Sequence, residues 1–436
     1  MLIYTENISP RLQYIAEFAG KLLTGNSFEL TTDKNQYLGS GAEKINYSPH
    51  KIADDECWIK PHGLLFEKNI TPQQIQCRDK DDRKIFFSTE GDWPFDIFAA
   101  SFYLLTRYEE YLPHSKDMYG RYAHENSLAY REKFLGIPLI NIWWNDFKNV
   151  YRDRFSTLNS TSLQAFTFLP TYDIDIAWSY KGKGWQRNLG GFLQSAFRGE
   201  WKQNKERLSV LRKKGRDPYD CYGWLNTLHE NYRLKPYYFF LVADKKGKYD
   251  RNISPNRPEL QELIRDHFIR YPIGLHPSWR SGDEHELLKK EIDTLSRITG
   301  SGCMSSRQHY IRFDLPETYR RLLDAGIRYD FSMGYGSING FRASVTTPFY
   351  WYDLQEEKQT ELMLFPFCYM EANSYYEQKF TAQQALEEMR EYRKVVKSVG
   401  GMLITVWHNH FLGSEETFGE WKQVYEEFIR ETAEKV

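Results

Sequence analysis

The sequence contains few cysteines and no long apolar segment. Its five cysteines are scattered over 436 residues and form no Cys-x-x-Cys pair, which excludes a short-spaced zinc or redox motif. This usage favours a reducing compartment. No apolar run of about 18 residues occurs, and the N-terminus lacks the basic start and apolar stretch of a secretory signal. We therefore expect a cytoplasmic protein that does not span a membrane.

The sequence also lacks a surplus of either charge. Lysine and arginine number 58 against 59 acidic residues, so the formal net charge is -1 at pH 7. Because general nucleic-acid binding requires a basic surplus to neutralise phosphates, we expect no nucleic-acid partner. Aromatic residues are abundant, at 16% of the chain. Their rings could stack on sugars or simply fill hydrophobic cores.

The chain is longer than one hydrophobic core usually organises, which predicts two domains. Residues 1–160 have a mixed pattern that predicts a smaller N-terminal α+β domain, with an amphipathic helix over 12–23. A largely apolar run predicts a buried helix over 95–111. Near its end, Glu109 and Glu110 could form an acid/base pair, or Arg107 could pair with Glu110 in an ordinary ion pair.

Residues 161–436 alternate short apolar runs with helical patterns, as repeated βα units do. Seven strands are expected, over 166–172, 237–242, 273–275, 308–313, 328–331, 362–365 and 403–407. Thr381 and Gln384 predict a capping box at the start of a helix that Gly400 ends. The pattern predicts an α/β domain whose parallel strands form a barrel or an open sheet. In both, functional residues gather at the carboxyl ends of the strands.

Polar residues do follow several of these predicted strands. Asp173 and Asp175 end the first strand two residues apart, so an extended chain would place them on one side. Two neighbouring carboxylates could act as a base and a cation ligand, although solvated acids at an exposed strand end fit equally well. His408 ends the last strand, where a general acid could lie.

Further candidates lie between these two ends of the domain. His276 follows the third predicted strand, Arg307 and His309 belong to the fourth, and Arg342 lies on a loop. A single histidine at a strand end is usually structural. The recurrence of acids, histidines and arginines at successive strand ends nevertheless predicts one shared site.

At these residues the chain resembles the polysaccharide deacetylases of the NodB-homology fold, carbohydrate esterase family four, over about residues 169–413. The resemblance implies a distorted seven-stranded (β/α) barrel that uses a divalent metal such as zinc. It implies that Asp173 is the base, that Asp175 and His276 bind the metal, that Arg342 orients the base and that His408 is the acid. The N-terminal region, residues 217–220 and residues 307–310 resemble a Bacteroidetes-type subgroup with an extra N-terminal domain.

The chain departs from this family in its second motif. There Arg280 stands where the family has its second metal-binding histidine, and two protein ligands would hold a catalytic ion poorly. His309 could supply the missing ligand, or it could be a structural or substrate-contacting histidine. Trp279, Arg307 and Tyr335 are the expected substrate-binding residues, since aromatic rings near strand ends could stack on a sugar.

A basic segment follows the aspartate pair. Residues 181–216 contain eleven lysines and arginines but only Glu200 and Glu206 as acids. Large apolar residues recur every four positions from Trp185 to Trp201, a pattern typical of a helix that lies on a membrane surface. We hypothesise that the segment lies over the site and favours anionic substrates or an anionic membrane. A plain solvated helix packed on the barrel is the alternative.

Three functions are compatible with these patterns. The first is a metal-dependent hydrolase that removes N- or O-acetyl groups from a sugar or a cell-envelope glycan precursor. The second is a catalytically degenerate, carbohydrate-binding relative, which Arg280 would support. The third is a scaffold in which the N-terminal domain and the basic segment matter more than the cleft.

Overall fold

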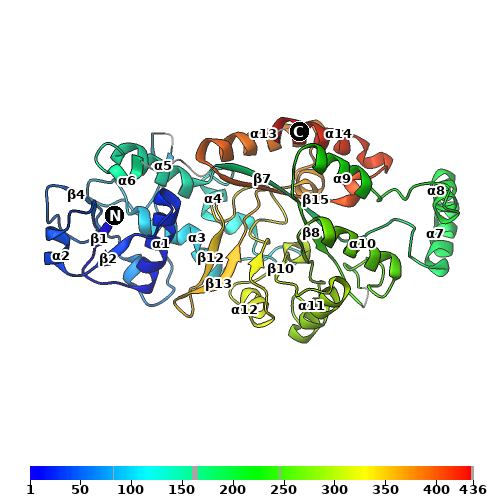
Figure 1. The fold of residues 1–436 in the computed structure, drawn as a ribbon, viewed down its shortest axis with the longest axis horizontal. Coiled ribbons are helices and arrows are strands. Elements are labelled where there is room, and N and C mark those ends of the chain that lie inside the picture. Colours follow the sequence, from blue (N-terminus) through cyan, green and yellow to red (C-terminus); the bar gives the residue numbers. More distant parts are fainter. Residues whose placement is uncertain (82, 160–164, 245–246, 434–436) are drawn as a thin grey trace.

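The computed structural model describes residues 1–81, 83–159, 165–244 and 247–433. The molecule is elongated, with the N-terminal region at one end, a large sheet in the middle and a projecting pair of helices at the other end (Figure 1). The predicted boundary between residues 160 and 161 lies outside the described residues. None of the described helices has the length and apolar character needed to cross a membrane.

The N-terminal region contains a small parallel sheet with the order β2-β1-β3-β4. Its strands are β1 (Leu2–Tyr4), β2 (Glu29–Thr31), β3 (Lys44–Asn46) and β4 (Glu56–Trp58), and β5 (Arg78–Lys80) and β6 (Arg83–Ile85) form a separate hairpin. Its helices are α1 (Pro10–Thr24), α2 (Lys34–Gly39), α3 (Ile97–Leu105), α4 (Leu128–Arg131), α5 (Leu139–Tyr151) and α6 (Ser156–Asn159). The amphipathic helix predicted over 12–23 is α1, which begins after the capping side chain of Ser9 and ends at Gly25.

The buried helix predicted over 95–111 is shorter than expected. Helix α3 is buried along its whole length, but it ends before Arg107, which has a left-handed backbone conformation (φ 56°). A 3-10 turn, η2 (Tyr108–Tyr111), follows. The predicted ion pair is confirmed, because Arg107 Nε lies 2.7 Å from Glu110 Oε1.

The large sheet has nine strands in the order β12-β13-β11-β10-β9-β8-β7-β15-β14. Their bounds are β7 (Phe166–Ile174), β8 (Tyr237–Phe240), β9 (Ile273–Leu275), β10 (Ser305–Ser306), β11 (Tyr329–Asp330), β12 (Phe349–Asp353), β13 (Lys358–Leu364), β14 (Tyr369–Met370) and β15 (Gly401–His408). Only β12 pairs antiparallel with its neighbour, so the sheet is mixed but mainly parallel. The predicted α/β class is confirmed.

The predicted strand count of seven is wrong in two respects. The strand expected over 308–313 is instead a 3-10 turn, η4 (His309–Ile311), because Tyr310 and Ile311 have positive φ angles of 60° and 54° that no strand accommodates. Strands β10, β12 and β14 were not expected. Two of these three have only two residues, which is too short to leave a readable alternation in the sequence.

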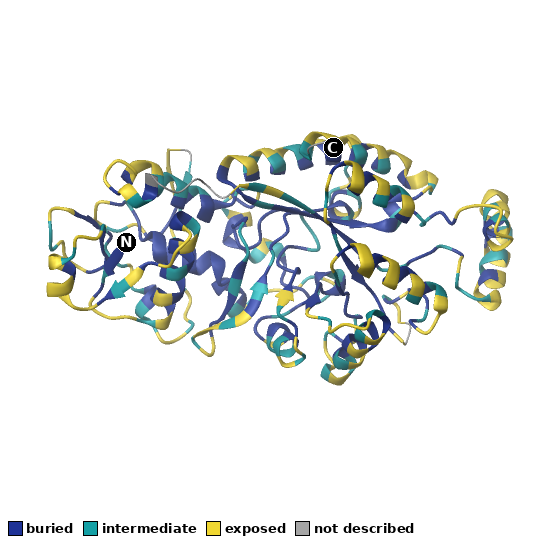
Figure 2. Ribbon diagram, in the orientation of Figure 1, coloured by how far each residue is buried: buried dark blue, intermediate teal, exposed yellow. Residues whose placement is uncertain are grey.

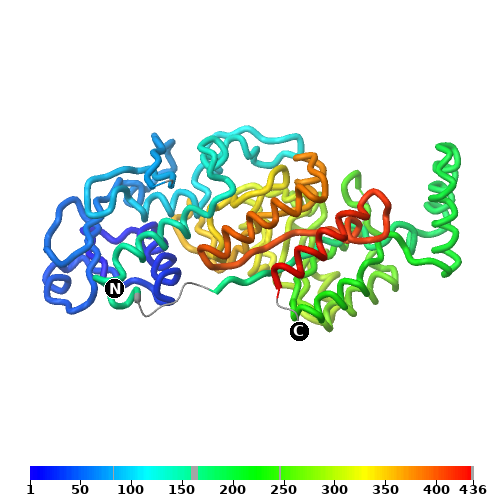
Figure 3. The backbone as a smooth tube through the Cα atoms, turned by 90° about the horizontal axis from the view of Figure 1, so that it is seen from above, coloured from blue at the N-terminus to red at the C-terminus, as the bar shows by residue number. Residues whose placement is uncertain are grey.

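Helices cover the outer face of the large sheet, and Figure 2 shows their buried sides facing inward. They are α9 (Tyr222–Asn231), α10 (Pro258–Arg270), α11 (His285–Thr299), α12 (Glu317–Asp324), α13 (Ala382–Val399) and α14 (Gly419–Thr432). Helix α13 begins with the predicted capping box of Thr381 and Gln384 and ends at Gly400. Helices α7 (Trp185–Phe197) and α8 (Trp201–Leu211) instead project from the far end of the molecule (Figures 1 and 3).

A buried group of charges joins the N-terminal region to the large sheet. Glu110 accepts hydrogen bonds from Arg107 and from Arg342, whose Nη2 lies 2.6 Å from Glu110 Oε2. All three side chains are at most 3% exposed. Burial would raise the pKa of Glu110, but Arg342 and Arg107 outweigh it and hold this pKa at about 2. The carboxylate therefore stays ionised and bridges two arginines.

We expect Glu110→Gln to destabilise the fold by about 3 kcal/mol, because it leaves Arg342 buried without its carboxylate partner. Urea unfolding would measure the change. Glu17→Gln is the matched control, since Glu17 pairs with Lys21 on the exposed surface of α1 and should cost less than about 0.5 kcal/mol. Equal effects of the two substitutions would contradict the bridging role of Glu110.

Candidate active site

A pocket of about 480 Å³ opens at the carboxyl ends of the strands of the large sheet. Five of the predicted site residues line it: Asp173, Asp175, His276, His309 and His408. The other lining residues are Tyr119, Arg121, Tyr310, Ile311, Gly336, Met370, Ala372, Asn373, Tyr376, Glu377, His410 and Phe411. The volume lies within the range of small-molecule binding sites.

The strand order explains why these residues meet. Strand β7 lies between β8 and β15, and His408 at the end of β15 is in register with Asp173 near the end of β7. His276 follows β9 directly, and Arg307 follows β10. Because parallel strands all end at the same edge of a sheet, their last side chains converge as the sequence predicted.

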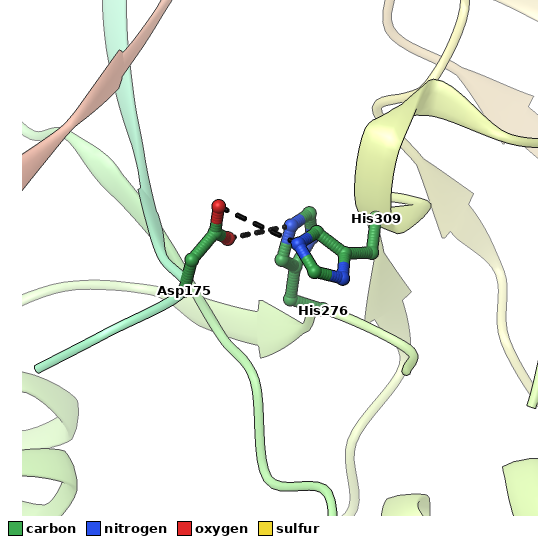
Figure 4. A group of neighbouring side chains, drawn as sticks. All are labelled: Asp175, His276 and His309. Carbon is green, nitrogen blue, oxygen red and sulfur yellow. Dashed lines mark ion pairs between the residues drawn. The ribbon is translucent and has the colours of Figure 1, made fainter. Parts of the chain in front are cut away.

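Asp175, His276 and His309 form a cluster that could hold a divalent metal (Figure 4). One Asp175 oxygen, Oδ1, lies 3.0 Å from His276 Nε2, and the other, Oδ2, lies 3.5 Å from His309 Nε2. One ligand atom from each residue lies within 4.8 Å of those of the other two. One carboxylate and two imidazoles are a common ligand set for a catalytic zinc ion.

The surroundings of the two histidines fit metal binding. His276 Nδ1 lies 2.6 Å from the carbonyl oxygen of Arg307. Since a carbonyl oxygen can only accept, the proton of neutral His276 is on Nδ1, and the lone pair of Nε2 faces Asp175. His309 Nδ1 lies 3.1 Å from Asp250 Oδ1, a carboxylate–histidine contact typical of metal ligands.

Two buried atoms of the cluster also form no hydrogen bond with the described residues. They are His276 Nε2 and Asp175 Oδ1, which face each other across 3.0 Å. Buried polar atoms are rarely left without a partner unless they bind water or an ion. A divalent cation between them would satisfy both.

The charge of Asp175 dominates the electrostatics of the pocket. Burial would raise its pKa, but the charges of His309 and His408 hold this pKa well below its ordinary value. In turn, burial would lower the pKa of His309, and Asp175 and Asp250 raise it to about 9. Asp175 is thus ionised and attracts cations.

Arg307, rather than Arg342, holds the predicted base. Arg307 Nη1 donates to Asp173 Oδ1 over 2.9 Å, and its Nε donates to the carbonyl oxygen of Phe331. The expectation that Arg342 orients Asp173 is wrong, because the guanidinium of Arg342 is bound to Glu110 and to the carbonyl oxygen of Gly334. The expectation that Arg307 contacts substrate also fails, since Arg307 is fully buried and does not line the pocket.

His408 is held by a carboxylate that the sequence analysis missed. Glu371, which is completely buried, accepts from both Nδ1 (2.6 Å) and the backbone N–H (2.7 Å) of His408. Burial would lower the pKa of His408, but Glu371 and Asp175 raise it to about 10. The Nε2 atom of His408 lies 3.5 Å from Asp175 Oδ2, so a protonated imidazole faces the pocket.

Two predicted substrate-binding aromatic residues do not line the pocket. Tyr335 is buried, and its hydroxyl oxygen accepts from Arg107. Trp279 stacks on Tyr249 with ring centroids 4.0 Å apart. It also contacts two tyrosines that line the pocket, Tyr310 with ring centroids 5.5 Å apart and Tyr119 at 6.3 Å. Trp279 therefore packs behind the pocket wall.

Arg280 does not occupy a ligand position. Its side chain is exposed and pairs with Glu284 at 2.8 Å. His309, from the turn η4, instead joins Asp175 and His276 in the group that could hold a metal. Arg280 therefore does not disturb this group of three candidate ligands.

The residues that the sequence analysis missed follow short or irregular segments. Glu371 comes directly after the two-residue strand β14, and Asp250 lies in the long connection between β8 and α10. Tyr119 and Arg121 come from the N-terminal region, where the sequence offered only Glu109 and Glu110 as candidates. Glu371 could have been recognised from the sequence only as a carboxylate directly after a predicted strand. Strand β14 was not predicted because it has only two residues, so Glu371 was not recognised.

One family model matches part of the chain. Residues 1–156 match the model of a family of unknown function, DUF7033. No curated protein matches the sequence.

Several solved structures resemble part of the chain at low identity. A candidate polysaccharide deacetylase from Mycobacterium smegmatis is 14% identical, with 62% of this chain aligned to 84% of that one at a TM-score of 0.39. A polysaccharide deacetylase from Bacillus cereus is 11% identical over 61% and 87% of the two chains, at a TM-score of 0.30. The allantoinase PuuE is 11% identical over 61% and 83%, at 0.37. At these TM-scores the similarity assigns no activity.

We expect the protein to bind about one equivalent of Zn²⁺ or Co²⁺. The variants His276→Ala and His309→Ala should each weaken this binding at least about 100-fold, because each variant lacks one of the three protein ligands. Elemental analysis and the visible absorption of the Co²⁺ form would measure this. Arg280→Ala should bind normally, since the Arg280 side chain pairs with Glu284 and is not among the candidate ligands. Normal binding by His309→Ala would show that His309 is not a ligand.

Proposed function

We propose that the protein is a metal-dependent hydrolase that removes acetyl groups, most simply N-acetyl groups, from a sugar or a glycan precursor. One observation carries the proposal. A single carboxylate, Asp175, lies within 3.5 Å of three imidazoles. With two of them, those of His276 and His309, it forms a group that could hold a metal ion. The third imidazole, His408, and the second carboxylate, Asp173, flank this cluster as an acid and a base.

The cluster of Asp175, His276 and His309 would hold the divalent metal. When bound there, a divalent cation supplies Lewis acidity that polarises an acyl oxygen and lowers the pKa of water. Arg307 holds one oxygen of Asp173, which fixes the carboxylate at the edge of the pocket. Glu371 fixes His408 on the other side.

In the proposed reaction, Asp173 accepts a proton from water as the water oxygen bonds to the acyl carbon. His408 donates its Nε2 proton to the leaving nitrogen as the carbon–nitrogen bond breaks. The products are a free amine and acetate. With an O-acetyl substrate, the same proton would go to the leaving oxygen.

The pocket wall supports a carbohydrate substrate. Tyr119, Tyr310, Tyr376 and Phe411 line the pocket and offer rings on which a sugar could stack. Arg121 and Glu377 add polar groups that could bind hydroxyls. We infer that these residues, rather than Trp279 and Tyr335, contact the substrate.

The organisation of the chain is part of this proposal. We propose an N-terminal accessory domain over residues 1–160 and a deacetylase-like barrel over 161–436. The two four-residue motifs at 217–220 and 307–310 support membership of the Bacteroidetes-type subgroup. The alternative is a relative that binds carbohydrate without catalysis. Arg280 in a ligand position was the main argument for it, and this argument fails because Arg280 lies outside the candidate metal cluster.

We expect Asp173→Asn to lower kcat for deacetylation by about 10²- to 10⁴-fold, because the amide cannot accept the proton from water. Release of acetate from N-acetylated oligosaccharides would measure the rate. The variant should still bind its metal, since Asp173 is not among the three ligand residues. A catalytically unchanged variant would remove Asp173 from the mechanism.

Glu371→Gln should lower kcat on the order of 10²-fold and leave KM and metal content nearly unchanged, because Glu371 acts through His408 rather than on substrate. Steady-state kinetics and elemental analysis of one preparation would separate these quantities. Glu291→Gln is the control, since Glu291 is equally buried but binds the backbone of Ser278. A rise in KM alone would contradict the positioning role.

A further inference from the structure

Helices α7 and α8 form a hairpin that projects from the end of the molecule opposite the N-terminal region (Figures 1 and 3). Internal polar contacts stitch the two helices together, including a hydrogen bond of 3.0 Å from Asn204 Nδ2 to the carbonyl oxygen of Phe192. At its base, Asp217 accepts from the backbone N–H groups of Ser179, Tyr180 and Lys181. The hairpin is therefore a shaped element rather than a loose loop.

The hairpin does not cover the active-site pocket. None of residues 181–216 lines that pocket, so the expectation that this segment lies over the site is wrong. The alternative of a helix packed on the barrel is also wrong for most of α7, because only Asn188 and Ser195 are buried in that helix. Figure 2 shows the hairpin as largely exposed.

An apolar ridge runs along the hairpin. Its members are the exposed side chains of Trp185, Leu189, Leu193, Phe197 and Trp201. Phe197 is 91% exposed and Trp185 is 73% exposed, although side chains of this size are normally covered. Beside the ridge, a groove of about 650 Å³ lies between the two helices, lined by Leu189, Phe192, Leu208 and Leu211.

The charge of the hairpin is opposite to that of the rest of the chain. Residues 181–216 carry eleven basic and two acidic side chains, a net charge of +9. The whole chain carries -1, so the remainder carries -10. Arg212, Lys213 and Lys214 are exposed at the end of α8, and Lys205 is exposed within it.

We propose that this hairpin docks the protein on an anionic lipid bilayer. Aromatic and aliphatic side chains would enter the interface between headgroups and acyl chains, and the surrounding lysines and arginines would meet lipid phosphates. The groove would accommodate part of an acyl chain. Pairing of two hairpins is disfavoured because each carries +9, so the charge points to an anionic surface instead of a second copy.

Sedimentation of the full-length protein with sucrose-loaded vesicles tests the proposal. Vesicles of phosphatidylcholine with about 30% phosphatidylserine would be compared with pure phosphatidylcholine vesicles, each at low and high salt. We expect binding to the anionic vesicles that weakens with salt, because exposed charges are screened. Trp185→Ser/Phe197→Ser should reduce the partition coefficient at least about tenfold, and Arg212→Glu/Lys214→Glu should reduce it on anionic vesicles.

Two matched variants keep the test specific. Ile269→Ser removes an apolar side chain that is 81% exposed but lies on α10, outside the ridge. Lys34→Glu/Lys394→Glu makes the same charge change at exposed positions outside the hairpin. Both controls should bind like the unchanged protein.

Three results would overturn the proposal. They are no binding at low salt, equal binding to neutral vesicles, and equal loss in the control variants. A concentration-dependent dimer that Trp185→Ser/Phe197→Ser abolishes would assign the ridge to a second copy, and capture of an acidic protein in place of vesicles would assign it to a protein partner. The hairpin does not line the active-site pocket, so its variants should deacetylate a soluble substrate normally. Failure of membrane binding would therefore not count against the proposed activity.

Discussion

The negative charge of Asp175, whose side chain is only 22% exposed, is the constraint on which the site depends. A carboxylate in a largely buried pocket is costly unless cations or hydrogen-bond donors surround it. Here His309 and His408 supply positive charge from two different segments of the chain, and His276 presents the lone pair of its Nε2 atom. The Nδ1 atom of each imidazole contacts a carbonyl oxygen or a carboxylate on the side away from Asp175. These contacts restrict the orientation of each ring around Asp175.

The carboxylate that each buried arginine binds decides whether that arginine can act on the site. Arg342 and Arg307 are both almost completely buried, and each has found one carboxylate, Glu110 and Asp173 respectively. Because a buried guanidinium without a partner is strongly unfavourable, the pairing is exclusive. Glu110 from the N-terminal region binds Arg342, and Arg307 holds Asp173. The N-terminal region therefore influences the site through charge as well as through its position.

The parts of the site that depend on local sequence patterns could be predicted, and the parts that depend on contacts between distant residues could not. Asp173 and His408 follow long apolar strands with a clear pattern, so both the strands and their polar ends could be predicted from the sequence. The partners of Arg342 and His408 could not, because Glu110 is distant from Arg342 in the sequence and Glu371 is distant from His408. His309 was recognisable as a candidate ligand, but the turn that places it was not. That turn depends on positive φ angles, which sequence periodicity does not encode.

The turn after His309 also ties the two parts of the chain into one site. Tyr310 and Ile311 adopt left-handed conformations that typically cost about 1 kcal/mol or more each, so other contacts must stabilise them. One such contact comes from the N-terminal region, where Arg121 Nη1 donates to the carbonyl oxygen of Tyr310 over 2.8 Å. Gly336 leaves room for it, since a Cβ there would lie 2.0 Å from Arg121 Nη1. A side chain outside the large sheet thus supports the turn that presents His309 to Asp175, and the sheet alone does not account for the geometry of the site.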